Sequence, residues 1–301
     1  MGAAKFLRGL LRVADPSTLT IIVNTGDDER FFGLAVSPDL DTITYTAADV
    51  ADPCTGWGLR DDSFHCLAAL ARLYDETWFH LGDRDLATHL YRTERLAAGA
   101  TLSTVTAELC RAFGVAARIL PMTDDRVRTV IDTAAGALSF QRYLVRGRAR
   151  PAVRRIRYLG AARARPAPGV VAAIRDATAV VIAPSNPLLS IAPMLAVPGI
   201  RRALERRRGP TVAVSPLVGR RAPTGPLARQ LRGLGMTASS TTIAGCYRPF
   251  LDALVIDRSD AGEAAALAAA GCRAVVTDTL FTTARRATAT ARYVLRAAGI
   301  G

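Results

Sequence analysis

Several features that would mark a secreted, membrane or zinc-knuckle protein are scarce in this sequence. The five cysteines stand at positions 54, 66, 110, 246 and 272, and none forms a CxxC pair. This spacing argues against a disulfide framework and is typical of a reducing cytoplasm. No apolar run approaches the roughly 18 residues of a membrane span, and the first residues lack the apolar segment and cleavage site of a secretory signal. We therefore expect a cytoplasmic protein with no membrane partner.

Lysine and aromatic residues are also scarce. Lys5 is the single lysine among 39 basic residues, and aromatics make up 6% of the chain. The net charge of +13 comes from arginine, which is densest in residues 146–165 and 201–208. Such a field attracts phosphorylated ligands or nucleic acid, but a general bias toward arginine and alanine gives the same composition. We favour the bias and expect no nucleic-acid partner, because these two stretches contain a single aromatic residue, Tyr158.

Short β-branched runs alternate with alanine- and leucine-rich amphipathic stretches. The pattern predicts βαβ units on a mostly parallel sheet. The predicted strands are Leu19–Asn24, Ala179–Pro184, Thr211–Ser215, Ala253–Asp257 and Ala274–Asp278. The predicted helices are 61–74, 83–98, 101–113, 196–206, 226–234, 261–270 and 280–298.

The middle of the chain has a different pattern, with many arginines and three short strand-like runs. These runs are Val127–Thr133, Phe140–Val145 and Ile156–Leu159. We predict that residues 119–167 form an inserted small α+β subdomain, and that residues 1–118 and 168–301 form the core.

The richest polar constellation follows the first predicted strand. Asn24–Asp28 and Ser37–Thr42 together carry Asp27, Asp28, Asp39 and Asp41 within fifteen residues. Clustered carboxylates beside a phosphate suit Mg²⁺, which uses one or two carboxylates plus phosphate oxygens. Aspartates also favour turns and helix caps, but two pairs after one strand exceed what capping needs.

Two further polar segments allow both a structural and a ligand-binding interpretation. Gly82–His89 begins a predicted helix, where its aspartates either cap the helix or, with Arg84 and Thr88, face a ligand. Ala183–Pro193 is either an ordinary proline-rich turn or a rigid binding lip that offers Ser185, Asn186 and Ser190.

The beginning of the sequence resembles the back half of a glycine-rich loop that runs into a helix. Such a loop presents backbone N–H groups to phosphate, and Lys5 would add a point charge. Taken alone, this signal is weak.

These segments together resemble the 2-phospho-L-lactate transferase family of coenzyme F-420 biosynthesis, and the likeness covers nearly the whole chain in order. The most specific strings are Gly-Asp-Arg-Asp-Leu-Ala-Thr-His and Pro-Ser-Asn-Pro-x-x-Ser-Ile-x-Pro. The matching segments are Asn24–Asp28, Pro38–Thr42, Gly56–Gly58, Gly82–His89, Arg118–Asp125, Phe140–Gln141, Ala183–Pro193, Pro198–Ile200, Gly225–Pro226, Asp257 and Thr277–Thr279.

The resemblance implies a Rossmann-like, doubly wound α/β fold with a smaller subdomain. The implied reaction moves a 2-phospholactyl or phosphoenolpyruvyl group from a guanosine diphosphate ester to the terminal ribityl hydroxyl of FO, the deazaflavin precursor. The products are F-420-0, or its dehydro form, and GMP, and Mg²⁺ is required. We also expect a homodimer, the commonest assembly of soluble oligomers.

The resemblance further implies residue roles. Mg²⁺ is expected on Asp27, with Asp39 or Asp41 as a second ligand, while Asp28 is a candidate for orienting the hydroxyl as a general base. Gly2 and Lys5 are expected to meet phosphate, and Thr25 and Gly26 are also expected to bind substrate. The residues expected on the FO side are Asp83, Arg84, Asp85, Thr88, Ser185, Asn186, Pro187 and Ser190.

One departure from the family pattern concerns the beginning of the sequence. Met1 occupies a position inside the family's glycine loop, and the strand that precedes this loop is absent. We expect the true start to lie upstream. The alternative is a protein that lacks both a core strand and half of its phosphate loop.

Two other functions compete with the transferase. One is a UDP-sugar-binding metabolic regulator of the same fold, in which we would not expect the two specific strings together. The other is a basic nucleic-acid-binding protein, whose binding would weaken steeply with salt.

Overall fold

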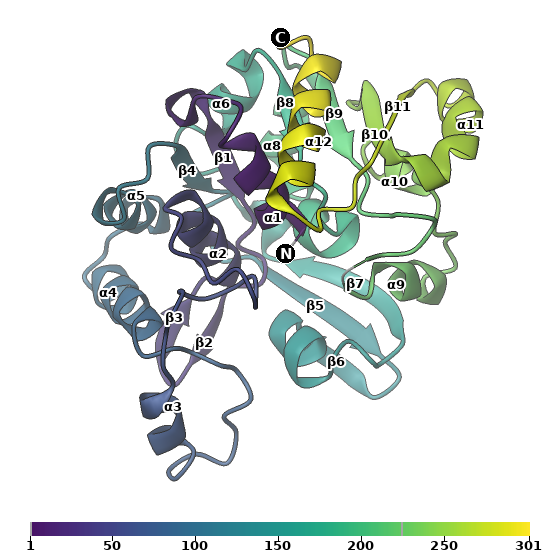
Figure 1. The fold of residues 1–301 in the computed structure, drawn as a ribbon. Coiled ribbons are helices and arrows are strands. Elements are labelled where there is room, and N and C mark those ends of the chain that lie inside the picture. The colour runs from purple at the N-terminus through teal and green to yellow at the C-terminus, as the bar shows by residue number, and fades with distance from the viewer. Residues whose placement is uncertain (1, 224) are drawn as a thin grey trace.

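The largest sheet of the computed structural model is parallel and has the strand order β11-β10-β9-β8 (Figure 1). The model describes residues 2–223 and 225–301. The four strands are β8 (Val180–Ile182), β9 (Thr211–Val214), β10 (Ala253–Asp257) and β11 (Arg273–Thr277). All four lie where the apolar runs predict strands.

Both faces of this sheet are covered along its central strands β9 and β10, whose residues are all buried, which explains why these two strands read as apolar runs. Successive side chains of a strand point to opposite faces. Val212, Val214 and Val255 therefore pack against α1 (Gly2–Leu10) and α12 (Ala284–Ala297). The alternate residues pack against helices of the opposite layer: α6 (Val170–Asp176), α8 (Pro198–Glu205), α9 (Leu227–Gly233), α10 (Ser240–Cys246) and α11 (Ala264–Ala269). The predicted doubly wound, Rossmann-like α/β fold is confirmed.

A second parallel pair carries the first polar constellation. β1 (Thr20–Val23) pairs with β4 (Arg118–Pro121), and both pack on α2 (Pro38–Ala47) and α5 (Leu102–Ala112). β1 ends one residue before Asn24. The Asn24–Asp28 segment therefore leaves the carboxyl end of a parallel strand, the end at which open α/β sheets bind ligands.

Two antiparallel units complete the sheets. β2 (Glu29–Phe31) and β3 (Leu34–Val36) form a hairpin, and β6 (Gly136–Ser139), β5 (Arg128–Thr133) and β7 (Val153–Leu159) form a sheet in that order. The latter lies within the predicted insert, and β4 lies across the predicted boundary after residue 118. The division into core and insert stays a prediction.

The strand predicted at Phe140–Val145 is wrong. Residues Arg142–Arg146 form a π-helical turn, η2. Phe140 and Tyr143 both pack into the cluster with Ile131, and a three-residue spacing brings two side chains to one face of a helix, not of a strand.

The helix predicted at 61–74 is mostly wrong, because only α3 (His65–Leu70) forms there. Asp61 has a left-handed backbone with φ of +56°, which excludes it from a helix. α4 (Asp85–Ala97) and α5 follow the prediction closely, and Thr101 caps α5 as expected by accepting from the Thr104 backbone N–H.

The remaining helical elements are short. They are η1 (Pro16–Thr18), η3 (Ala161–Arg163), η4 (Pro187–Ile191), α7 (Ala192–Leu195) and η5 (Arg258–Glu263). Within the ranges that the model describes, no helix combines the length and the apolar character needed to cross a membrane.

Candidate active site

Asn24 organises the turn that follows β1. Its side-chain oxygen accepts from the Gly26 backbone N–H at 2.9 Å. Its side-chain nitrogen donates to Asp27 Oδ1 at 2.9 Å and to Asp39 Oδ2 at 3.1 Å. One amide group thus holds the carboxylates from the strand end and from the first turn of α2 close together. Gly26 is required here, because a Cβ at this position would lie only 2.8 Å from Thr129 Oγ1.

Asp28 follows Asp27 in the same turn, and its charge acts on Asp27. Ser37 Oγ donates to Asp28 Oδ2 at 2.7 Å, and Ser37 directly precedes α2. The other oxygen, Oδ1, is buried and has no hydrogen-bond partner among residues 2–223 and 225–301. We call Asp27, Asp28 and Asp39 the acid cluster.

Burial dominates the electrostatics of the acid cluster. It raises the pKa of Asp27 well above the usual range, and the charges of Asp39 and Asp28 raise it further. Burial likewise raises the pKa of Asp28, against the hydrogen bond from Ser37 and the positive charge of Arg92. The pKa of Asp39 is raised by burial and partly restored by Asn24. A cluster of this kind is stabilised by protonation or by a bound cation.

The donor set fits the expected Mg²⁺. In the described ranges, no group of three or more His, Cys, Asp or Glu side chains is arranged to hold a metal ion by itself. Mg²⁺ does not need such a group, because it keeps several waters and takes one or two carboxylates plus phosphate oxygens. Three buried side-chain oxygens have no hydrogen-bond partner among the described residues: Asp28 Oδ1 and Thr25 Oγ1 in the turn after β1, and Thr129 Oγ1 on β5 beside Gly26. These oxygens and the carboxylates of Asp27 and Asp39 are hard donors suited to this ion.

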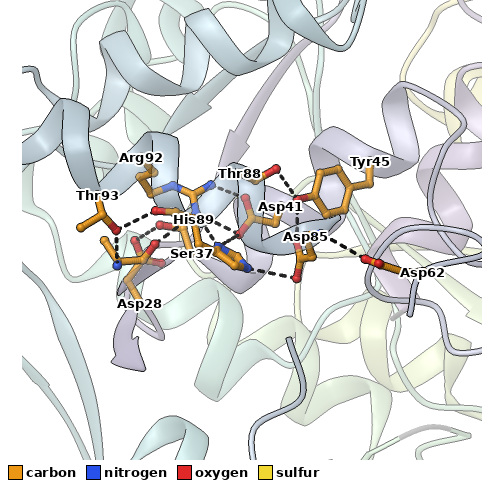
Figure 2. Close-up of polar contacts among 11 residues, drawn as sticks. Asp28, Ser37, Asp41, Tyr45, Asp62, Asp85, Thr88, His89, Arg92 and Thr93 are labelled. Atoms are coloured by element: carbon orange, nitrogen blue, oxygen red, sulfur yellow. Dashed lines mark hydrogen bonds and ion pairs between the residues drawn. The ribbon is translucent and has the colours of Figure 1, made fainter. Parts of the chain in front are cut away.

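Asp41, the fourth predicted carboxylate, is paired with an arginine of α4. Arg92 binds both of its oxygens, and the Arg92 side chain is 2% exposed (Figure 2). His89 Nδ1 accepts from Arg92 Nη1 at 3.2 Å. Burial alone would lower the pKa of Arg92, but the charge of Asp41 outweighs it and raises the pKa. Arg92 therefore stays charged and compensates Asp41.

Asp85 and Thr88 belong to this same buried network. Tyr45 Oη lies 2.6 Å from Asp85 Oδ1 and 2.8 Å from Thr88 Oγ1, and His89 Nε2 lies 3.0 Å from Asp85 Oδ2 (Figure 2). Both predicted substrate-binding residues thus contact α2 and α4 side chains inside the protein.

Asp62 and Asp83 each cap the helix that follows the other residue in the sequence. Asp83 accepts from the backbone N–H groups of His65 and Cys66 at the start of α3, both at 2.9 Å. Asp62 accepts from the backbone N–H groups of Arg84 and Asp85 at the start of α4. Asp83 therefore caps α3 rather than the helix that it precedes in sequence. The Arg84 side chain is exposed and donates to the carbonyl of residue 60.

The proline-rich loop after β8 is organised by Asn186. Its side-chain oxygen accepts from the backbone N–H groups of Leu188 and Leu189, which caps η4. Its side-chain nitrogen donates to Gln230 Oε1 at 2.6 Å. Ser185 and Ser190 are half-buried, and Pro187 is buried.

The remaining expected substrate-binding residues lie in two places. Gly2 and Lys5 are in α1, and Thr25 and Gly26 are in the turn that follows β1. A Cβ at Gly2 would lie 2.4 Å from the Pro184 carbonyl oxygen, so α1 begins directly against the loop after β8. Lys5 is exposed, and Thr25 and Gly26 are buried. The expectation that Met1 lies in a phosphate loop falls outside the described residues.

Comparison with known proteins decides the family. The model of the family described as 2-phospho-L-lactate transferase CofD matches residues 1–294. The protein belongs to the CofD family. It is therefore a transferase.

Relatives named phosphoenolpyruvate transferase and relatives named 2-phospho-L-lactate transferase are both similar to this chain. A phosphoenolpyruvate transferase of Streptomyces griseus is 43% identical over 283 residues, covering 91% of this chain and 89% of the relative. A 2-phospho-L-lactate transferase of Methanosarcina mazei is 37% identical over 296 residues, covering 98% and 97%. A crystal structure of a UPF0052-family protein from Bacillus halodurans has a TM-score of 0.63 and 15% identity, covering 98% and 96%, and shows the fold alone.

Three residues of this CofD-family site were not among the predicted site residues. They are Asn24, Ser37 and Gln141, whose side-chain nitrogen donates to the backbone oxygen of Asp27 at 3.2 Å. Asn24 and Gln141 stand inside strings that carry the resemblance, which was the available signal. Nothing local in the sequence indicates that Ser37 contacts Asp28.

Proposed function

We propose that this protein transfers a 2-phospholactyl or phosphoenolpyruvyl group from a guanosine diphosphate ester to the terminal ribityl hydroxyl of FO, with Mg²⁺, in coenzyme F-420 biosynthesis. The reaction takes place in the cytoplasm between small-molecule substrates, in a homodimer. Family membership supports the transferase class, and the names of the relatives support these two transferred groups.

The observation that carries the proposal is the geometry of the acid cluster. Asn24 donates to both Asp27 and Asp39 through one side-chain nitrogen, and the neighbouring Asp28 carries a buried oxygen with no hydrogen-bond partner among the described residues. Phosphoryl transfer needs positioning and charge neutralisation more than covalent chemistry from the protein. Carboxylates that are crowded at the carboxyl end of a parallel strand, and that a bound cation would stabilise, meet this need.

Asp27 and Asp39 are the residues that would hold Mg²⁺, and the ion would offset the charge of the donor's diphosphate. We assign the second position to Asp39 rather than Asp41, because Arg92 occupies both oxygens of Asp41. Gln141 braces Asp27 by donating to its backbone oxygen.

Asp28 is the residue that we assign to the incoming hydroxyl. Its Oδ1 is free to accept, while Ser37 fixes its Oδ2. The hydroxyl oxygen of FO forms the new bond to the phosphorus that carries the three-carbon acid, the bond from that phosphorus to GMP breaks, and the hydroxyl proton passes to Asp28. Because burial raises the pKa of Asp28, this carboxylate is a stronger base than an exposed aspartate.

A turnover assay tests the proposal. Protein and FO are incubated with the lactyl, enolpyruvyl and glyceryl guanosine diphosphates in parallel, and GMP and deazaflavin product are followed by chromatography. We expect product from one donor with Mg²⁺ and none with EDTA. Asp27→Asn should reduce turnover on the order of 100-fold or more, as losing a principal charge-stabilising group does.

Asp49→Asn is the matched control. Asp49 is exposed, lies 4.0 Å from Arg60, and has a left-handed backbone that asparagine tolerates. Its turnover should equal that of the unaltered protein. Absence of product from all three donors with folded protein and Mg²⁺, or full activity of Asp27→Asn, would refute the proposal.

A further inference from the structure

Five arginines line one hollow of the surface beside α9. The cavity measures about 720 Å³ and is lined by Arg148, Arg220, Arg221, Arg229 and Arg232 among other residues. A second hollow of about 610 Å³ shares Arg220 and Arg232 with it. We call these two hollows together the arginine groove.

The positive charge of the arginine groove is poorly compensated. No acidic side chain is found among the described residues that line either hollow. Within the same described ranges, Arg220 alone of the five arginines forms an ion pair, between its Nε and Glu263 Oε1 at 2.9 Å. Like charges gathered in a concave surface focus a positive potential that attracts anions.

A compositional bias toward arginine does not explain the backbone of the groove. Of the six non-glycine residues with positive φ in the described ranges, Arg148, Ala149 and Arg220 line this one hollow. Such conformations cost on the order of 1–3 kcal/mol each and gather at ligand-binding sites.

Buried contacts hold these strained residues in place. Asp260, 4% exposed, accepts from the backbone N–H groups of Gly219 and Arg220, both at 2.9 Å. Arg229 donates to the Ala149 carbonyl. Two chain segments far apart in sequence are thereby locked around the groove.

The groove is distinct from the acid cluster. Neither hollow is lined by Asp27, Asp28 or Asp39. Beneath the groove, η2 and α9 are joined by buried side chains, because Gln230 donates to Tyr143 Oη at 3.3 Å and accepts from Asn186.

We propose that the arginine groove is a binding site for a small molecule that carries a diphosphate group. Guanidinium groups bind phosphate oxygens through two parallel hydrogen bonds, which makes arginine the residue of choice for this anion. Single-stranded nucleic acid is a poorer match, because no aromatic side chain lines the groove for bases to stack on. The diphosphate is either that of a nucleotide or that of a non-nucleotide metabolite, and the proposal holds whether or not the transferase reaction is confirmed.

Calorimetric titration with inorganic pyrophosphate tests the site. EDTA is present throughout, so that the acid cluster has no metal through which to bind phosphate. The groove variant is Arg221→Gln with Arg232→Gln. The charge-matched control is Arg285→Gln with Arg286→Gln, two exposed side chains on α12 outside the groove. Circular dichroism melts confirm that both variants are folded.

We expect the groove variant to bind pyrophosphate at least ten-fold more weakly than the unaltered protein, and the control to stay within two-fold. The same titrations with GDP identify the source. A parallel loss for GDP assigns the groove to a nucleotide, and a loss for pyrophosphate alone assigns it to a non-nucleotide diphosphate. Equal pyrophosphate affinity in the two variants, or no pyrophosphate binding by the unaltered protein, would overturn the proposal.

Discussion

Gln141 donates its side-chain N–H to the backbone oxygen of Asp27 at 3.2 Å, across 114 positions of the sequence. The same nitrogen lies 3.4 Å from Asp27 Oδ2. Gln141 lies between β6 and η2. The segment that follows β6 therefore braces the residue that we assign to Mg²⁺.

Replacing Gln141 by alanine should therefore impair the reaction without unfolding the protein. A lost hydrogen bond of about 1 kcal/mol corresponds to an approximately five-fold lower kcat/KM. Steady-state kinetics with varied Mg²⁺ measures the effect, and the Mg²⁺ concentration for half-maximal rate should rise. Arg142→Ala, at the exposed neighbouring position, is the control. Unchanged kinetics in Gln141→Ala would show that the brace has no catalytic consequence.

Arg92→Met should destabilise the protein strongly. Arg92 and Asp41 are both buried, and removing one partner leaves an uncompensated charge, which costs about 3–5 kcal/mol. Urea unfolding measures this loss. Arg92→Met with Asp41→Leu should recover most of it, because the pair is then replaced by apolar groups.

Arg95→Met is the control for that pair. Arg95 pairs with Glu108 nearer the surface, and such a pair is worth less than about 1 kcal/mol. A similar loss in Arg92→Met and Arg95→Met would contradict a buried, compensated Asp41.

Asp83→Ala should loosen α3 locally. The carboxylate caps this helix through the backbone N–H groups of His65 and Cys66, and losing such a cap costs about 1–2 kcal/mol. Hydrogen exchange of these two amides should accelerate, while Asp75→Ala, exposed and outside the cap, should leave it unchanged. If exchange stays slow and the KM for FO rises instead, Asp83 serves the substrate rather than the helix.

Asp85→Asn should remove a pH-dependent contribution to stability. Burial alone would raise the pKa of Asp85, but hydrogen bonds from His89 and Tyr45 outweigh it, and the net pKa is lowered. A carboxylate with a lowered folded-state pKa stabilises the protein above its unfolded value of about 3.9, and this stability is lost as the pH falls through the folded-state value.

The free energy of unfolding of the unaltered protein should therefore exceed that of Asp85→Asn by about 1–3 kcal/mol at pH 7. This difference should shrink as the pH falls from about 5 to 3. Urea unfolding across this range measures the difference, with the exposed Asp75→Asn as control. A difference that stays constant down to pH 3 would refute this assignment.

Elements stabilised by their own residues were predictable. The central strands β9 and β10 are buried on both faces, so their apolar runs stand out in the sequence. α5 carries its own cap at Thr101. The segment 61–74 is different, because Asp62 and Asp83 cap helices that lie about twenty residues away in the sequence. No local sequence pattern indicates caps at that distance.

The sequence by itself determined the family, the α/β architecture and the gathering of Asp27 and Asp28 at a strand end, because each depends on residues adjacent in the chain. Only the tertiary structure decided which carboxylates lie together. It paired Asp41 with Arg92 and left Asp39 beside Asp27. It also joined residue 148 to residues 220–232 in the arginine groove. Hydrogen bonds and ion pairs act over a few ångströms, so these partnerships exist only once the fold has brought distant segments into contact.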